Sequence, residues 1–501
     1  MDYKKLQNGS DIRGVALEGV EGQPITLTEP VCRDIGRGFA LWLIEKTGRR
    51  EGLRVSVGRD SRLSGETLCS WICDAMVSQG IAVTNFGMAS TPAMFMSTVT
   101  EGYAYDGAIM ITASHLPFNR NGFKFFTAQG GLESADIKAI LAYAAGSESA
   151  GLAPASMEEG SFMDTYATIL RDKICEATGE SQPLAGFRIV VDAGNGAGGF
   201  YADKVLQPLG ANTEGSRYLD PDGSFPNHIP NPEDKDAMKS IMDAVAETNA
   251  DLGIIFDTDV DRAGAVLADG SELNRNRIIA MLAAILLREH PGTTVVTDSI
   301  TSTGLARFIE KKGGIHHRFK RGYRNVINES IRLNAQGQDS QLAIETSGHG
   351  ALKENYFLDD GAYLVTKLLI ELARCRKEGT RLEALIADLE EPAESLEFRM
   401  NILVEDFKTY GQDVISALTA YAETQDGWSL APSNYEGVRV NLDEAHGNGW
   451  FLLRLSLHDP LLPLNIESND AGGAKIIAKE LAAFIAGYDK LDAAKILAYA
   501  E

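Results

Sequence analysis

The chain has 501 residues, of which 44% are hydrophobic and 23% are charged, and its formal net charge at pH 7 is −23. This length exceeds what one hydrophobic core normally serves, so several domains are expected. The strong negative charge argues against binding to nucleic acid or to an anionic membrane surface, and a phosphate ligand would need a locally basic site.

The sequence also indicates a cellular compartment. No apolar run reaches the roughly 18 residues needed to span a bilayer, and the N-terminal residues Met1-Asp2-Tyr3-Lys4-Lys5 lack the apolar segment of a signal peptide. The five cysteines are odd in number and scattered, with Cys69 and Cys73 four positions apart in an apolar stretch. We therefore expect buried, reduced thiols in a cytoplasmic protein.

Three stretches of the chain repeat one pattern, in which a β-branched strand ends at a polar or glycine turn and a helix follows. The first strands are predicted at 53–57, 187–191 and 294–297. Second strands are predicted near 81–83, 212–214 and 315–317. Third strands are predicted at 107–111, 252–256 and 341–344. This alternation predicts βαβ units with mixed, largely parallel sheets.

The repeats predict four domains. Three repeated α/β domains are expected at residues 1–155, 156–272 and 273–392, with a polar linker at 146–160. Residues 393–501 contain strands such as 450–454 and a helix from about residue 471, a pattern typical of an α+β domain. The three third strands end in the most unusual loops of the chain, so we expect the domains to surround one central cleft.

The first of these loops, Ser114-His115-Leu116-Pro117, follows a short apolar strand. Ligands of open α/β sheets bind at the carboxyl ends of the strands. The Ser114 hydroxyl is therefore placed where a ligand is expected, although an exposed serine is often only a turn residue.

The second loop, Asp257-Thr258-Asp259-Val260-Asp261, places three carboxylates on alternate residues after an apolar strand. Alternate side chains of an extended segment share a face, so the three can converge on one hard cation. An EF-hand is excluded, because its sixth and twelfth positions would be Arg262 and Ala268 instead of Gly and Glu. A haloacid-dehalogenase-type phosphatase with Asp257 as nucleophile would leave the Ser114 loop unexplained. The guanidinium of Arg262 is suited to bidentate phosphate contact.

The chain resembles the α-D-phosphohexomutases over essentially its whole length, because six motifs occur in that family's order. They are Ser10-Asp11-Ile12-Arg13-Gly14, Val57-Gly58-Arg59-Asp60-Ser61-Arg62, Thr91-Pro92, Ala113-Ser114-His115 with Asn121-Gly122-Phe123-Lys124, Asp257 to Arg262, and Glu345-Thr346-Ser347-Gly348-His349. The glycine-rich stretch 192–198 lacks the Gly-Lys-Ser/Thr of a P-loop and is interpreted as a structural turn.

The resemblance implies roles for individual residues. The implied catalytic residues are Ser114, as the phosphoserine that donates the phosphoryl group, with Lys124, Arg13, His115 and His349. One Mg²⁺ per chain is implied, with Ser114, Asp257, Asp259 and Asp261 as its ligands. The implied contacts to the sugar phosphate are Arg262, Lys320, Glu345, Ser347, His349, Arg454, Ser456 and His458.

The clearest departure from the family lies in its C-terminal phosphate loop, Arg-x-Ser-x-Thr-Glu-Pro followed by a second Arg. Arg454, Ser456 and Pro460 fit this pattern, whereas His458 replaces Thr, Asp459 replaces Glu and Pro463 stands where the second Arg is expected. We therefore expect a phosphate site that is weaker or differently angled.

The hypothesis from the sequence is an intramolecular phosphotransferase of the isomerase class. It interconverts the 1-phosphate and 6-phosphate of glucose and/or mannose through a phosphoserine enzyme and a bisphosphate intermediate, with hexose 1,6-bisphosphate as activator. A phosphoglucosamine mutase and a catalytically weakened sugar-phosphate-binding paralogue are the alternatives. The expected partner is a small-molecule sugar phosphate, and the expected state is a monomer or weak dimer.

Overall fold

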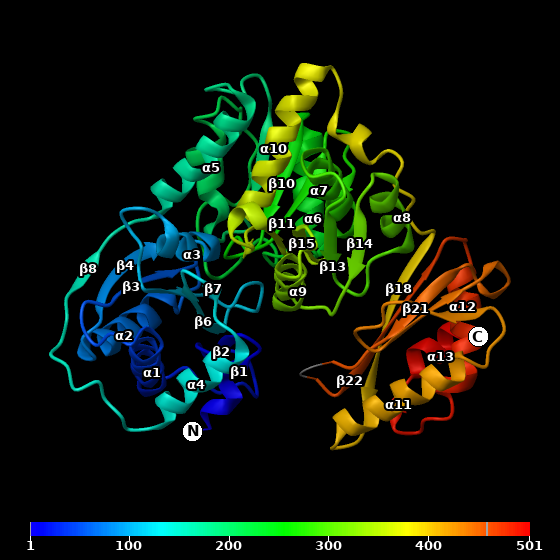
Figure 1. The fold of residues 1–501 in the computed structure, drawn as a ribbon, viewed down its shortest axis with the longest axis horizontal. Coiled ribbons are helices and arrows are strands. Elements are labelled where there is room, and N and C mark those ends of the chain that lie inside the picture. Colours follow the sequence, from blue (N-terminus) through cyan, green and yellow to red (C-terminus); the bar gives the residue numbers. More distant parts are fainter. Residues whose placement is uncertain (1, 457–458) are drawn as a thin grey trace. The chain divides into compact units, whose positions relative to one another are not determined.

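The structure is a computed structural model that describes residues 2–456 and 459–501 (Figure 1). The chain divides into two compact units. One comprises Met1–Ile285 and Ser347–Leu385, and the other comprises Leu286–Thr346 and Ile386–Glu501. Among the described residues, no helix is long and apolar enough to cross a membrane.

The first unit begins with a mixed sheet of eight strands, ordered β1-β2-β6-β5-β3-β4-β8, with β7 paired to β6. Its strands are β1 (Gln7–Asn8), β2 (Asp11–Val15), β3 (Arg54–Arg59), β4 (Ala82–Met88), β5 (Gly107–Ile111), β6 (Arg120–Thr127), β7 (Gly130–Gly131) and β8 (Met157–Glu159). Its helices are α1 (Glu29–Thr47), α2 (Gly65–Ser78), α3 (Thr91–Val99) and α4 (Ser134–Ala145). In Figure 1, α1, α2 and α4 lie on one side of this sheet and α3 on the other.

The parallel part of this sheet follows the predicted pattern, with β3 hydrogen-bonded to β4 and β5. All five residues of β5 are buried, as expected for a strand covered on both faces. The predicted linker at 146–160 is partly wrong, because residues 157–159 form β8 and extend the sheet beside β4. All three residues of β8 are exposed and two are glutamates, so the sequence shows no apolar strand pattern there.

The second sheet of this unit has the order β12-β11-β10-β9. Its strands are β9 (Ile189–Asp192), β10 (Leu252–Phe256), β11 (Ala263–Leu267) and β12 (Glu272–Leu273), and α5 (Met163–Thr178) and α6 (Lys235–Thr248) accompany them. β9 and β10 are parallel, and β10 and β11 are antiparallel. The strand predicted near 212–214 is absent as a full strand, since this segment contributes only isolated bridges such as Arg188 to Asn212. The unit also contains β16 (Gly350–Leu352), β17 (Leu358–Asp359) and α10 (Gly361–Glu378).

The glycine-rich stretch after β9 is a structural turn, as predicted. Gly194 has φ +52, and a Cβ there would lie 2.8 Å from the Pro230 Cβ. The buried Asp192 carboxylate accepts hydrogen bonds from Gly194 N (2.9 Å), Ser240 Oγ (2.6 Å) and His228 Nε2 (3.0 Å). Asp192 therefore ties the turn to α6 and to the loop that carries His228.

This contact predicts a pH-dependent stability. Burial lowers the pKa of His228, but the hydrogen bond and charge of Asp192 outweigh burial, and the net pKa lies above 6.5. The pair therefore stabilises the fold fully below about pH 6.5 and loses this contribution as the pH rises through the folded-state pKa. We expect the urea midpoint of the wild type to exceed that of His228→Gln by more at pH 6 than at pH 9. The control is His290→Gln, at a half-buried histidine directly after α7. If the difference between wild type and His228→Gln were equal at both pH values, the His228–Asp192 pair would not be the cause.

The second unit contains a parallel sheet and an antiparallel sheet, and α7 (Arg275–Glu289) leads into it. The parallel strands lie in the order β14-β13-β15, with β13 (Thr294–Thr297) between β14 (Ile315–Arg318) and β15 (Ser340–Ile344). Helices α8 (Thr303–Lys311) and α9 (Tyr323–Ala335) connect these strands. All three strands were predicted from the sequence.

The antiparallel sheet has the order β19-β20-β21-β22-β18-β23. Its strands are β18 (Glu394–Ile402), β19 (Trp428–Leu430), β20 (Val438–Leu442), β21 (Gly449–Leu453), β22 (Leu461–Ser468) and β23 (Leu491–Asp492). Helices α11 (Phe407–Ala422), α12 (Gly473–Ile485) and α13 (Ala494–Ala500) share an apolar core with it. This is the predicted α+β arrangement.

Candidate active site

The Ser114 loop connects β5 to β6 in the first unit. Ser114 is only 6% exposed and has a left-handed backbone, with φ +50. Its Oγ donates to Asp257 Oδ2 (2.9 Å) and accepts from Arg262 Nη2 (2.9 Å). The sequence places these residues 143 positions or more apart, so the fold itself brings the hydroxyl to the acidic loop.

The acidic triplet follows β10 directly. Asp257, Asp259 and Asp261 are buried, and each offers a carboxylate oxygen within 4.8 Å of those of the other two. Burial raises the pKa of Asp257, and the charges of Asp261 and Asp259 raise it further. Among the residues that the structure describes, Oδ1 of Asp259 and Oδ1 of Asp261 are buried without a hydrogen-bond partner. Such a set of crowded, incompletely satisfied carboxylates fits a hard divalent cation.

Two cationic side chains, Lys124 and Arg262, lie against the triplet. Lys124 Nζ, from β6, is 3.1 Å from Asp259 Oδ2 and also contacts Asp261 Oδ2. Arg262 Nε is 3.3 Å from Asp257 Oδ2. Burial lowers the pKa of Lys124, but Asp259 and Asp261 outweigh burial and raise it well above its usual range. Lys124 is therefore an ammonium group in this structure.

Arg13 and His115 border the Ser114 loop. Arg13 donates to Asp11 Oδ2 (2.8 Å) and to the main-chain oxygen of Thr112. β2 approaches β6 so closely here that a Cβ on Gly122 would lie 2.1 Å from Ile12 O, so this position requires glycine. His115 Nδ1 lies 3.3 Å from Ser114 Oγ and also contacts Arg262. Burial and then the Arg262 charge lower the pKa of His115 to about 3, so its imidazole is neutral.

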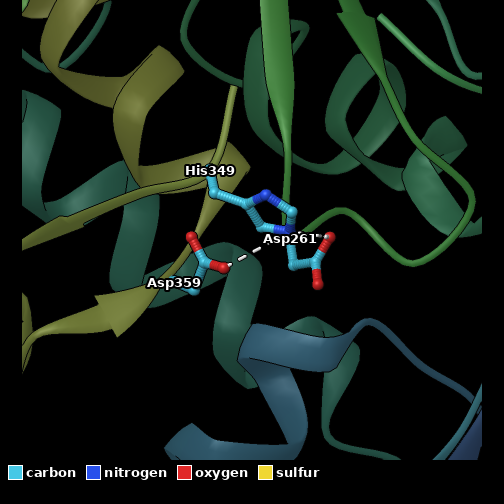
Figure 2. Close-up of side chains that lie close together, drawn as sticks. All are labelled: Asp261, His349 and Asp359. Atoms are coloured by element: carbon cyan, nitrogen blue, oxygen red, sulfur yellow. Dashed lines mark ion pairs between the residues drawn. The ribbon is translucent and has the colours of Figure 1, made fainter. Parts of the chain in front are cut away.

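His349 lies between two carboxylates, as Figure 2 shows. Its Nε2 is 3.6 Å from Asp359 Oδ2 and 3.8 Å from Asp261 Oδ1, and its Nδ1 is 3.0 Å from Ser347 Oγ. Burial lowers the pKa of His349 well below its usual value, and the charge of Arg262 acts in the same direction. A neutral imidazole beside the triplet is suited to accepting a proton.

The remaining predicted contacts belong to the second unit. The buried Glu345 accepts from Gly322 N (2.6 Å), and Lys320 is exposed on the same connection. Arg454 Nη1 lies 4.0 Å from Glu436 Oε1, and its Nε is buried without a hydrogen-bond partner among residues 2–456 and 459–501. Ser456 Oγ accepts from Asp459 N (3.3 Å). His458 lies outside the described residues.

Comparisons with known proteins identify the family of this chain. Family models of phosphoglucomutase/phosphomannomutase α/β/α domains I, II and III match residues 4–150, 164–270 and 274–392. The chain is 31% identical to a phosphomannomutase/phosphoglucomutase of Pseudomonas aeruginosa over 463 residues, which cover 92% of each protein. The chain belongs to the phosphoglucomutase/phosphomannomutase family.

Two further matches cover nearly all of both chains. A phosphoglucomutase of Neisseria gonorrhoeae is 30% identical over 471 residues, which cover 94% of this chain and 95% of that relative. The crystal structure of a phosphoglucomutase/phosphomannomutase family protein from Burkholderia thailandensis matches with a TM-score of 0.77 and 28% identity, covering 97% of this chain and 98% of that one. The predicted family and the predicted α/β fold class with a C-terminal α+β domain are therefore confirmed.

Two residues of the site, Thr91 and Asp359, were given no role by the sequence analysis. Thr91 donates through its hydroxyl to Asp259 Oδ2, and its N–H donates to Asp259 O (2.8 Å). Asp359 was missed altogether. The adjacent acids Asp359 and Asp360 were visible in the sequence, but Asp360 accepts from the Tyr166 hydroxyl (2.7 Å) and caps α10, while Asp359 faces His349. Only the fold distinguishes the two.

Proposed function

We propose that this protein is a hexose-phosphate mutase in which Ser114 carries the transferred phosphoryl group. The observation that supports this most directly is the Ser114 Oγ, which contacts both Asp257 of the acidic triplet and Arg262. A phosphoryl group on this oxygen would lie between a carboxylate-bound cation and a guanidinium. Phosphoryl transfer depends mainly on such positioning and charge neutralisation.

The residues present fit a bound Mg²⁺, which Asp257, Asp259 and Asp261 would hold together with an oxygen of phosphorylated Ser114. When bound, the ion would supply positive charge to the phosphoryl oxygens. The family assignment and the buried acidic triplet support this metal. We propose that the ion is Mg²⁺ and that each chain binds one.

The reaction consists of two transfers. In the first, a free hydroxyl of the hexose monophosphate attacks phosphorus, the bond from phosphorus to Ser114 Oγ breaks, and the neutral imidazole of His349 accepts the hydroxyl proton, which passes on to the released Ser114 oxygen. Arg262 and Arg13 stabilise the transferring group. In the second, Ser114 Oγ loses this proton and attacks the original phosphate of the 1,6-bisphosphate, the bond from that phosphorus to the sugar oxygen breaks, and the proton ends on the new sugar hydroxyl. Added hexose 1,6-bisphosphate would act as activator by phosphorylating Ser114.

The sugar is best identified by a substrate panel. We expect glucose 1-phosphate and mannose 1-phosphate, primed with the bisphosphate, to be converted to their 6-phosphates, and intact mass to show one phosphate on the chain. Faster turnover of glucosamine 1-phosphate would favour the glucosamine alternative. Release of inorganic phosphate alone would indicate a phosphatase, and absence of turnover with every sugar would indicate the binding paralogue.

Arg454 is proposed to bind the phosphate that does not react. Its Nε is buried without a hydrogen-bond partner among the described residues, although the carboxylate of Glu436 partly offsets the positive charge of the guanidinium. We expect Arg454→Gln to raise KM about 100-fold with a much smaller change in kcat, because a charge-assisted bond to the ground-state phosphate is lost. Steady-state kinetics would measure this. Arg399→Gln, on an exposed arginine of β18, is the control, and an unchanged KM in Arg454→Gln would place the phosphate elsewhere.

A further inference from the structure

We infer that Arg62 positions Ser114 for phosphoryl transfer by holding the main chain of its loop. The inference rests on the proposed function. Arg62 belongs to the Val57–Arg62 motif that begins in β3, and its side chain is 0% exposed. Burying a guanidinium is costly unless its donors find acceptors, so the acceptors of its Nη1 and Nη2 groups indicate what it stabilises.

Those contacts are main-chain carbonyls of one loop. Arg62 Nη2 donates to Ser114 O and to Leu116 O (2.6 Å). Its Nη1 donates to Pro117 O (2.8 Å) and Arg120 O (3.0 Å). One planar guanidinium thus binds three carbonyls of the loop between β5 and β6 and the carbonyl of Arg120, the first residue of β6. Lysine has no such rigid fork and could not replace it.

Arg62 is itself fixed in place. Its main-chain N–H donates to Asp60 Oδ1 (3.0 Å), and the Nε of its side chain forms an ion pair with Asp60 Oδ2 at 3.4 Å. Its guanidinium also lies over the ring of Phe225, 5.3 Å from the ring centroid. A side chain held on both sides in this way can impose a conformation on the loop.

The imposed conformation is an unfavourable one. A left-handed backbone at a non-glycine residue such as Ser114 is strained and persists only where neighbours enforce it. Thr112 Oγ1 accepts from Ser114 N (2.8 Å), while Arg62 binds Ser114 O. The serine is therefore held at both its amide and its carbonyl, and its Oγ is directed at Asp257 and Arg262. Arg62 does not contact the reacting oxygen, so its role is positioning.

The chain offers a matched control for this role. Arg37 also gathers four main-chain carbonyls, but at the C-terminal end of α4. Its acceptors are Tyr143 O (3.2 Å), Glu148 O (2.8 Å), Ala144 O (3.0 Å) and Gly146 O (2.7 Å). Arg37→Ala therefore removes the same type of contact without touching the Ser114 loop.

The experiment compares Arg62→Ala, Arg62→Lys and Arg37→Ala in the full chain. We expect both Arg62 variants to lose kcat about 100-fold per folded molecule, because a misplacement of about 1 Å at the reacting centre costs this much. We expect KM to stay within about twofold, since no substrate contact is removed. Millimolar guanidinium chloride should restore part of the kcat of Arg62→Ala and have no effect on wild type or Arg37→Ala.

The opposite results would overturn the inference. If Arg62→Ala and Arg37→Ala lose stability alike and keep wild-type kcat, Arg62 is only structural. If Arg62→Ala does not fold, the kcat of Arg62→Lys tests the inference instead. A wild-type kcat in Arg62→Lys would refute the positioning role. Failure of the proposed function is recognised separately, because wild type itself would then show neither mutase turnover nor a phosphate on Ser114.

Discussion

Replacing Ser114 with alanine is expected to abolish mutase turnover, with a loss of about 10⁴-fold or more, because the oxygen that carries the phosphoryl group is removed. The coupled assay with primed glucose 1-phosphate measures the loss, and intact mass should show that the added phosphate has disappeared. The fold should survive, since the change deletes one hydroxyl on a loop. Among the described residues, the Ser114 hydroxyl contacts only Asp257, Arg262 and His115.

Ser56→Ala provides the control for this variant. Ser56 is also buried, and its hydroxyl shares a 2.8 Å hydrogen bond with Ser97 Oγ. It should keep wild-type turnover. If Ser114→Ala retained activity while Asp257→Asn lost it, the phosphoserine mechanism would be wrong and Asp257 would be the nucleophile.

Removing the divalent cation is expected to lower turnover by about 10³-fold, which corresponds to about 4 kcal/mol of transition-state stabilisation. Treatment with EDTA should produce this loss, and added Mg²⁺ should reverse it. Asp259→Asn should lose activity to a similar extent without recovery. Its amide oxygen can still accept from Thr91, but one of the three charges that attract the ion is gone.

A stability measurement separates metal binding from catalysis. Because a ligand that binds only the folded state stabilises it, saturating Mg²⁺ at about 100 times its Kd should stabilise wild type by about 2.7 kcal/mol. The thermal midpoint of Asp259→Asn should respond much less. Asp413→Asn, an exposed acid on α11, should respond like wild type. An equal response in all three would mean that the triplet does not hold the ion.

The sequence predicted the strands of the site well because they are short, apolar and followed by polar turns. β10 matches its predicted bounds, and its five residues are fully buried, which is the pattern that apolar composition reveals. The segment at 212–214 was overpredicted, because composition cannot tell a strand from a stretch that makes isolated bridges. The four domain boundaries and the shared cleft stay predictions.

The functional residues of the site could be predicted only where they belong to a motif. Ser114 and Lys124 are distant in sequence from the Asp257–Arg262 loop, yet the structure brings them into contact with it. The roles of Arg62 and Asp359 were not predicted, because they depend on which atoms these side chains contact in the folded structure. A guanidinium that binds carbonyls leaves no signal in composition or spacing, and the choice between Asp359 and Asp360 depends on which side chain faces His349.

The restrained backbone of Ser114 has a consequence for the reaction cycle. Because Ser114 is held at both its main-chain amide and its carbonyl, its Oγ cannot move from one end of a hexose to the other. In the mechanism that we propose, the doubly phosphorylated sugar must therefore reorient between the two transfers without leaving the site. Affinity for the doubly phosphorylated hexose must therefore be high enough to prevent its loss and low enough to permit the turn.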